Sequence, residues 1–416
     1  MRVSHWKKLA AAMLAGLSLS ATSATLAANE PIPYIPAEPT TQFTAGVDFL
    51  IYTRDVDLQS PSNAIAGPDA GLLRFDSADF ERQAGFRAFL SMKADGLRVD
   101  AVYSEIGEWD HYRIGRMTTG LSFDDGIGSE WTGANSINLT TLFPSLHRAA
   151  TGALGGDADE FEGLSPSAAF NADTAPLYEL LYESEMATFE LNAFTIDDEN
   201  PYRWGLGYRN LELDEVAGVT ITGTFRAVDI AAPNGGLSHA SLTGPGGLTL
   251  LGGVANGFED ETSNPSFASD ILAISNNART SNRMNGIQAL LERRVMYWGG
   301  WTIDGVLKAG AFHNQARGII EEVYVGTDPV SGENSVYGRT LTDSEDCLSF
   351  IGSVGFNSYI PLSEHWSFTS GYEAMFLTDV ALAPDQNAGV TGGVYDVNAN
   401  GHVIIHGGRL GLQFAY

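Results

Sequence analysis

The stretch Trp301-Thr-Ile-Asp-Gly-Val-Leu-Lys-Ala-Gly-Ala311 decides the fold class of this chain. Its odd-numbered positions are apolar or small, whereas the even-numbered positions include Thr302, Asp304 and Lys308. A two-residue period places alternate side chains on opposite faces of a β-strand. Residues 409–416 repeat the pattern, with Leu, Leu, Phe and Tyr at the even-numbered positions. One face suits lipid and the other a wet lumen, so the pattern predicts an all-β, antiparallel transmembrane β-barrel.

Segments of about ten to fourteen residues with two-residue alternation recur along the chain. Such lengths exceed the five or six residues typical of globular strands and suit strands that cross a bilayer at a tilt. We therefore predict a barrel of about 12 antiparallel strands. The stretch from Leu177 to Phe194 also has apolar residues at near-helical spacing, so a helix is an alternative there, and we predict a strand for its first half. The predicted segments are 43–53, 80–93, 97–109, 186–196, 202–214, 217–228, 284–297, 301–314, 348–361, 365–378 and 403–416.

The composition fits a folded β-protein. Of the 416 residues, 44% are hydrophobic and 18% are charged, which is too apolar for a disordered chain. The 47 glycines suit turns and strand kinks better than helix interiors, where each glycine costs about 1 kcal/mol. A formal net charge of −28 repels phosphate backbones, so the sequence predicts no nucleic-acid partner.

Residues 1–28 have the features of a signal peptide. A basic start with Arg2, Lys7 and Lys8 precedes a short apolar core, and Thr25-Leu-Ala27 forms a small-x-small cleavage site. Removing residues 1–27 takes away three basic and no acidic residues, which moves the formal charge from −28 to −31. The proline-rich stretch 29–41 is predicted to be an extended tether, and 42–416 a single barrel domain.

Export leaves two fates for the mature chain. No apolar run after residue 28 reaches the roughly 20 residues of a helical span, which leaves a soluble secreted protein or an outer-membrane barrel. The single cysteine, Cys347, excludes an intramolecular disulfide. We expect the outer membrane, with its lipid bilayer and its insertion machinery as partners, because the alternating last strand and its end, Gln413-Phe-Ala-Tyr416, resemble the C-terminal signature that this machinery reads.

Two stretches, 125–175 and 229–282, are rich in Gly, Ser, Asn and Asp and are predicted to be long outer loops. Their acidic clusters include the run from Asp157 to Glu162, which lacks the spaced ligands of an EF-hand. The sequence therefore predicts no metal site. The acidic field favours weak selectivity for cations.

Aromatic residues recur at the ends of the predicted strands. Interfacial girdles of aromatic residues are typical of membrane barrels, whereas a single aromatic residue can equally be ordinary core packing. The predicted girdle residues are Trp204, Trp298, Trp301, Trp366, Phe414 and Tyr416.

Two predicted hairpins bring opposite charges together inside the barrel. A turn at 298–300 places Arg294 opposite Asp304, with Glu292 and Lys308 as diagonal neighbours on the same face. In the last hairpin, pairing Val380 near His402 places Glu373 opposite Arg409. These six residues are our candidates for a solute-selecting constriction. The alternative, which we favour, is a lumen in which these ion pairs have only the structural role of holding the strands together.

Several blocks resemble a family of outer-membrane β-barrel porins of the BBP type, known mainly from sequence. The resemblance covers most of 43–416 and is densest from 279 to 416. It implies an outer-membrane barrel and a channel, and it assigns no substrate and no catalytic residue. The blocks are Gly207-Tyr-Arg-Asn-Leu-Glu-Leu-Asp-Glu215, Arg279-Thr-Ser-Asn-Arg-Met-Asn-Gly-Ile-Gln288, Leu307-Lys-Ala-Gly-Ala-Phe-His-Asn314, Phe350-Ile-Gly-Ser-Val-Gly355 and Gly371-Tyr-Glu-Ala-Met-Phe-Leu-Thr-Asp-Val-Ala-Leu-Ala-Pro-Asp-Gln386.

The sequence thus predicts a porin-like passive channel for small solutes, with weak selectivity for cations. None of the seven histidines of the mature chain lies in a zinc-protease or deaminase motif, and no nucleophile-elbow pattern occurs, so we expect no enzyme activity and no cofactor. Two alternatives stay open: a structural or adhesive envelope barrel with a closed lumen, and a soluble secreted β-sandwich binding module. The oligomeric state stays open as well.

Overall fold

A computed structural model describes residues 41–57, 75, 80–94, 96–116, 121–122, 137–138, 147–148, 170–172, 177–196, 202–227, 230–231, 237–238, 242–243, 270–327, 334–391 and 394–416. The chain divides into residues 1–40 and 41–416, and all described residues belong to the second unit. The predicted signal peptide, and the predicted tether up to residue 40, lie outside the described residues.

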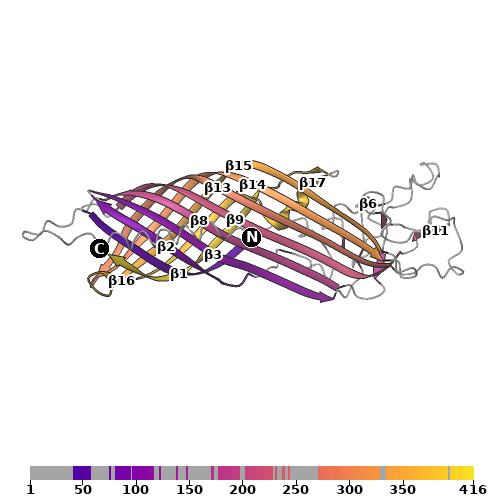
Figure 1. Cartoon of the computed structure of the whole chain (residues 1–416), viewed down its shortest axis with the longest axis horizontal. Coiled ribbons are helices and arrows are strands. Elements are labelled where there is room, and N and C mark those ends of the chain that lie inside the picture. Colours follow the sequence, from indigo (N-terminus) through magenta and orange to yellow (C-terminus); the bar gives the residue numbers. More distant parts are fainter. Residues whose placement is uncertain are drawn as a thin grey trace, which may run out of the picture. The chain divides into compact units, whose positions relative to one another are not determined.

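The second unit is a closed, antiparallel β-barrel (Figure 1). Within the described residues ten strands form the ring, in which β19 pairs with β1 and β9 pairs with β13 to close it. In spatial order the ring strands are β1 (Thr41–Asp57), β2 (Gln83–Ala94), β3 (Leu97–Arg116), β8 (Leu177–Thr195), β9 (Tyr202–Ala227), β13 (Asp270–Trp298), β14 (Trp301–Thr327), β15 (Asn334–Pro361), β16 (Trp366–Val380) and β19 (Gly401–Ala415).

Several short elements are not among the ten ring strands. The three-residue β7 (Phe170–Ala172) extends the sheet by pairing with the end of β9. The others are β4 (Leu121–Ser122), β5 (Ile137–Asn138), β6 (His147–Arg148), β10 (Ile230–Ala231), β11 (Leu237–Ser238), β12 (Leu242–Thr243), β17 (Val390–Thr391), β18 (Val394–Tyr395) and the 3₁₀ helix η8 (Ala383–Gly389).

The strand register fixes the dimensions of the barrel. Following the paired residues once around the ring from Thr302 returns to Asn314, twelve residues further along β14. With the usual strand spacing and rise, ten strands and this stagger give a tilt of about 40° and a backbone diameter of about 20 Å. That width leaves room for inward side chains and little else.

The all-β barrel was predicted correctly, and its ring has ten strands where we expected about 12. The predicted segments 202–214 and 217–228 are one continuous strand, β9. The adjacent acids Asp214 and Glu215, near the predicted break, lie on opposite faces of the strand, and Glu215 is buried inside.

The strand predicted for residues 177–194 is confirmed, and the helical alternative is wrong. Side chains of β8 alternate between buried and more exposed from end to end. Tyr178, Leu180 and Tyr182 are buried, while Leu181 lies on the other face. The near-helical spacing arose because both faces of this strand carry apolar residues.

The strands β13, β14 and β15 are about twice as long as predicted. They span 29, 27 and 28 residues, and β13 begins at Asp270, inside the predicted loop 229–282. Beyond the middle of each strand most outward residues are polar, with exceptions such as Val323 and Val336, so the alternation was not recognised there. The rest of that predicted loop and most of 125–175 lie outside the described residues.

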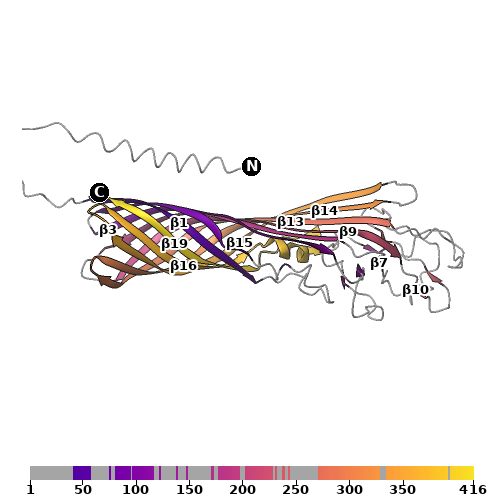
Figure 2. The ribbon, with the colours of Figure 1, turned by 90° about the horizontal axis from the view of Figure 1, so that it is seen from below.

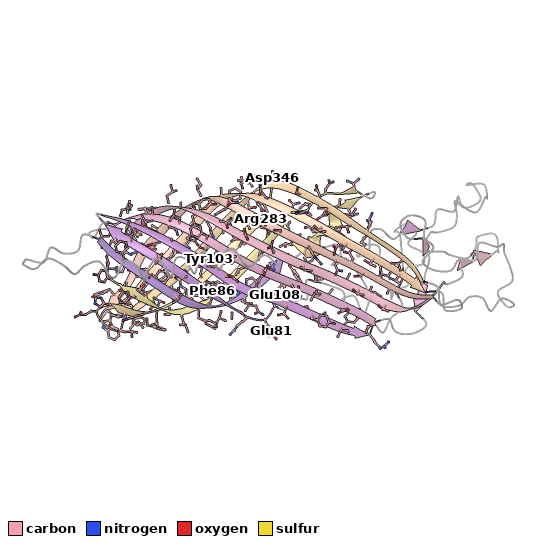
Figure 3. All side chains as sticks on the ribbon, in the orientation of Figure 1. Glu81, Phe86, Tyr103, Glu108, Arg283 and Asp346 are labelled. Carbon is pink, nitrogen blue, oxygen red and sulfur yellow. The ribbon has the colours of Figure 1, made fainter. Side chains whose placement is uncertain are left out.

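Apolar side chains cover the outer face at one end of the barrel. The exposed large hydrophobic residues include Phe49 on β1, Leu206 on β9 and Phe356 on β15. Further along the strands the outward residues become charged: Figure 3 shows Phe86 and Tyr103 nearer the end with the short turns than Glu108 and Arg283. The apolar belt takes up about ten residues of each tilted strand, or about 25 Å along the barrel axis.

The connections differ at the two ends of the barrel. At the belt end, β2 and β3 are joined through Gly96, and β13 and β14 through Gly299 and Gly300; all three glycines have positive φ. The longer connections, including 117–176 and 228–269, all leave the opposite end. No helix among the described residues is long and apolar enough to cross a membrane.

Candidate functional site: the lumen and its plug

The first predicted hairpin has the expected register. Arg294 lies opposite Asp304, with 3.5 Å between Arg294 Nε and Asp304 Oδ1. Glu292 and Lys308 lie on the same inward face, each one step diagonal from the other across the hairpin. The turn is formed by Gly299 and Gly300, and a bulge follows Arg294.

The second predicted hairpin is shifted by two residues. Glu373 pairs with Gly407 and Arg409 with Gly371, so the two charges are diagonal rather than opposite. A shift of two keeps the face unchanged, and both side chains line the lumen. The shift arises because a bulge after Thr378 sets Val380 against Gly401.

Charges from other strands complete the lumen, and sequence reasoning missed them. Arg98 Nη2 lies 2.7 Å from Glu292 Oε1, and Arg203 Nη1 lies 3.4 Å from Asp304 Oδ2. Lys308 Nζ lies 2.8 Å from Glu190 Oε2. Arg98, Arg203 and Glu190 pair with residues about 100 to 200 positions away in sequence, so only the closed ring brings them together.

A second group of charges lies across the lumen. Arg87 Nη1 lies 2.6 Å from Asp48 Oδ2, and Thr369 donates a hydrogen bond of 2.6 Å to Asp48 Oδ1. Arg409 lies within 4.0 Å of the same carboxylate and also donates to Asn357. Each cation of the two groups therefore has a carboxylate partner.

These charges border two cavities. The larger has a volume of about 500 Å³, lies at the short-turn end and is lined by four arginines, three aspartates and two glutamates. We call it the vestibule. A smaller one of about 50 Å³ lies deeper and borders Lys308, Glu373 and Arg409. The six predicted constriction residues all line one or both cavities, and their role in selecting solutes stays a prediction.

The six predicted girdle residues all lie at the short-turn end. Trp204, Trp298, Trp366 and Tyr416 are exposed on the outer face. Phe414 packs against Trp366 with ring centroids 5.2 Å apart. Trp301 is half-buried and donates a 2.6 Å hydrogen bond to Ser358. Their role as an interfacial girdle also stays a prediction.

Above the ionic layer the interior turns apolar. Every ring strand except β2 contributes one buried, inward hydrophobic residue to a level we call the collar. Neighbouring members lie opposite or one step diagonal to each other in the strand register, as for Ile106 with Met186 and Leu211 with Met284. The collar consists of Tyr52, Ile106, Met186, Leu211, Met284, Phe312, Ile351, Met375 and Ile405.

Beyond the collar, the connection between β16 and β19 folds into the barrel, and Figure 2 shows η8 among the ring strands. We call residues 379–391 and 394–400, which begin with the last two residues of β16, the plug. Its apolar residues, including Leu382 and Val397, belong to the same core cluster as the inward residues of β9, β13 and β14.

Polar side chains of the wall hold the backbone of the plug. Asn282 accepts a 2.7 Å hydrogen bond from the N–H of Ala381 and donates a 2.8 Å bond to its carbonyl. Ser349 donates a 2.7 Å bond to the carbonyl of Asp379. Asp343 accepts a 3.0 Å bond from the N–H of Val397. The wall thus binds both ends of the plug through backbone groups that the ring itself leaves unused.

A buried ion pair lies beneath the plug. Arg54 and Glu215 form a salt bridge in which both side chains are fully buried, and Arg54 also donates a 3.1 Å bond to Tyr182. Glu215 accepts a further 2.9 Å bond from the N–H of Ala383. The pair therefore connects two distant strands to the first residue of η8.

Comparisons with known proteins identify no family. No family model matches the chain, and no curated protein matches it, so the resemblance to BBP-type porins stays a prediction. Solved structures of outer-membrane barrels are similar over most of its length. The outer-membrane protease OmpT from Escherichia coli is 11% identical, covers 93% of this chain and 99% of its own, and has a TM-score of 0.34.

Two channels show weaker similarity. The CymD monoaromatic hydrocarbon channel is 9% identical over 91% of this chain and 88% of its own, with a TM-score of 0.25. The toluene transporter TodX from P. putida is 9% identical over 91% of this chain and 90% of its own, with a TM-score of 0.21. Because these TM-scores are low, the barrel is assigned from the closed ring of antiparallel strands itself.

Proposed function

We propose that this protein is an outer-membrane barrel whose lumen is a passage for small solutes, closed by the plug. The observation that carries the proposal is that the lumen is filled by a separate segment. Residues 379–391 and 394–400 are held by hydrogen bonds between wall side chains and plug backbone, and such contacts can open without disturbing the ring.

The outer surface supports the membrane location. A closed ring leaves no unpaired strand edge around the apolar belt, as a bilayer requires. The height of the belt, about 25 Å, matches the apolar band of outer-membrane barrels. Short turns at one end and long connections at the other match the periplasmic and outer sides of such proteins. Export by the predicted signal peptide and use of the insertion machinery are parts of this proposal.

Strong selectivity for cations finds little support in the lumen. The vestibule is lined by four arginines and five carboxylates, and four of these carboxylates, Asp48, Asp100, Glu292 and Asp304, lie against arginines as ion pairs. Paired charges create only a weak net field. We propose that any cation preference comes from the acidic surface rather than from the vestibule.

A second candidate is a structural envelope barrel whose lumen never opens. It is favoured by the fully buried Arg54–Glu215 pair and the continuous apolar cluster between wall and plug. An enzymatic function is not part of either proposal.

A disulfide between wall and plug distinguishes the two candidates. The bonds between Asn282 and Ala381 bring these positions within reach of a disulfide. We would make Asn282→Cys with Ala381→Cys in a Cys347→Ser background. The oxidised protein has a locked plug, and the reduced protein lacks the Asn282 hydrogen bonds.

Tracer flux is then measured in outer-membrane vesicles with rubidium, glucose and naphthalene. The flux measured with the oxidised protein, whose plug is locked, gives the background that crosses the lipid. A passage predicts that reduction raises the flux of at least one tracer severalfold. Equal fluxes in both redox states for all three tracers would favour the closed structural barrel, provided that the Cys347→Ser parent shows no redox response.

A further inference from the structure

We infer that the collar restricts the passage to uncharged, apolar solutes. This inference rests on the proposed function and names its substrate class. It is carried by the change in the lumen lining, from paired charges in the vestibule to a ring of buried hydrophobic side chains directly above them.

The collar lines the lumen on every described ring strand except β2, where Gln83 pairs with Tyr52 and Gly85 with Ile106. Its members lie on nine of the ten ring strands and are all buried. The contact between Arg209 Nη2 and Met375 Sδ, at 2.9 Å, shows that the collar begins where the ionic layer ends. A solute that moves between plug and vestibule must therefore pass among these side chains.

The chemistry of the collar determines what can pass. An ion or a sugar would lose its water there and, apart from the hydroxyl of Tyr52, would find no hydrogen-bonding group among the collar side chains, a cost of several kcal/mol for each polar group in an apolar medium. Hydrophobic constrictions in channels exclude ions by dewetting. An apolar solute does not meet this dehydration cost, because it has no polar groups. At the collar it replaces apolar contacts near the plug by apolar contacts of the same kind.

The residue types of the collar also suit solutes of varied shape. Met186, Met284 and Met375 supply three of its nine side chains. Methionine is unbranched and adapts to irregular partners, so it is common at apolar surfaces that accept several ligands. The plug itself presents Leu382, Val397 and other apolar groups to the wall, so its departure uncovers apolar wall residues beside the polar groups that hold its backbone.

The inference predicts which tracer responds to the plug disulfide. With the native collar, reduction raises the naphthalene flux severalfold, while the rubidium and glucose fluxes change less than twofold. Adding Leu211→Asn and Met284→Gln makes the collar polar. In that variant reduction also raises the rubidium flux severalfold, and the oxidised form stays closed to it.

A spectroscopic readout tests the collar directly. In protein labelled at the methionine methyl groups, naphthalene shifts the NMR signals of Met186, Met284 and Met375 in the reduced variant and leaves them unchanged in the oxidised one. Met92 is 40% exposed on the outer face and reports nonspecific partitioning into detergent. Collar signals that move no more than that of Met92 would overturn the inference.

The two proposals fail in different ways. If no tracer responds to reduction, the passage itself is absent and the proposed function fails. If rubidium or glucose passes the native collar upon reduction, the passage exists and the collar does not restrict it, so only this inference fails.

Discussion

The two halves of the same barrel are built on opposite patterns. In the half with the short turns, β9 carries Leu206 outward and Arg203 inward. In the other half, the same strand carries Asp214 outward and Leu211, Leu213 and Ile221 inward, all fully buried. The alternation continues without a break. What changes is which face, the outer or the inner one, carries the apolar residues. A single strand can therefore meet lipid outside in one half and build a water-excluding core inside in the other.

The largest loss of stability is expected in the half of the barrel with the buried apolar interior. Glu215→Gln removes the carboxylate from the fully buried pair with Arg54 and leaves a buried, uncompensated guanidinium. Breaking a buried pair in this way costs about 3–5 kcal/mol. We expect the temperature of the gel-mobility shift in mild detergent to fall strongly. The double variant Arg54→Met with Glu215→Leu should recover most of the loss, and a double variant as unstable as Glu215→Gln would contradict this account.

A second prediction compares the two outer faces on one strand. Leu191 and Leu181 both point outward from β8, ten residues apart, and only Leu191 lies in the apolar belt. Leu191→Arg should cost about 2–4 kcal/mol, as for arginine facing lipid, whereas Leu181→Arg should be close to neutral. Urea unfolding in lipid vesicles measures both. Equal costs would mean that the belt does not face lipid.

A third prediction makes the same type of substitution, Glu to Gln, in the half of the barrel with the ionic lumen. Glu190→Gln leaves Lys308 without its closest carboxylate, at 2.8 Å in the native protein. Because the lysine borders a cavity and retains Glu373 at 3.8 Å, the expected cost is about 1–3 kcal/mol, smaller than that of Glu215→Gln. The same gel-mobility assay ranks the two variants. The reverse order would show that the smaller cavity beside Lys308 is drier than its lining indicates.

The smallest effect concerns pH. Burial, followed by the charge of Asp343, raises the pKa of Tyr395 in the plug above its ordinary value. Docking of the plug therefore keeps its full strength below the ordinary tyrosine pKa of about 10 and weakens as the pH rises above it. The ultraviolet titration of tyrosinate, taken as the difference from Tyr395→Phe, should have a higher midpoint in the oxidised disulfide variant than in the reduced one. Identical midpoints would mean that the tyrosine does not sense the plug.

The fold could be predicted wherever the outer face is apolar. Residues 301–311 and 409–416 show clean alternation because one face is apolar and the other polar; the first stretch lies in β14, and the second lies in β19 up to Ala415. The extensions of β13, β14 and β15 were missed because most of their outward positions are polar and their inward ones mix alanine and asparagine, as at Ala278 and Asn282. Without contrast between faces, the period of a strand cannot be seen in the sequence.

The candidate site shows the same division. The pairing of Arg294 with Asp304 follows from one short hairpin, so local register was enough to predict it. The partners Arg98 and Glu190 come from strands far away in sequence, and only ring closure places them in the lumen. The plug was missed because residues 379–391 and 394–400 have no periodic pattern, and their position depends on single side chains such as Asn282.

The place of the plug in the chain has a consequence for assembly. The plug lies between β16 and β19, and β19 is the strand that closes the ring against β1. Its docking partners on β9, β13 and β14 all precede it in the chain. The segment can therefore settle on the unfinished sheet before the seam forms, and no chain end has to thread through a completed cylinder. Closure of the seam then traps the segment inside, so the last hairpin to fold both completes the wall and fills it.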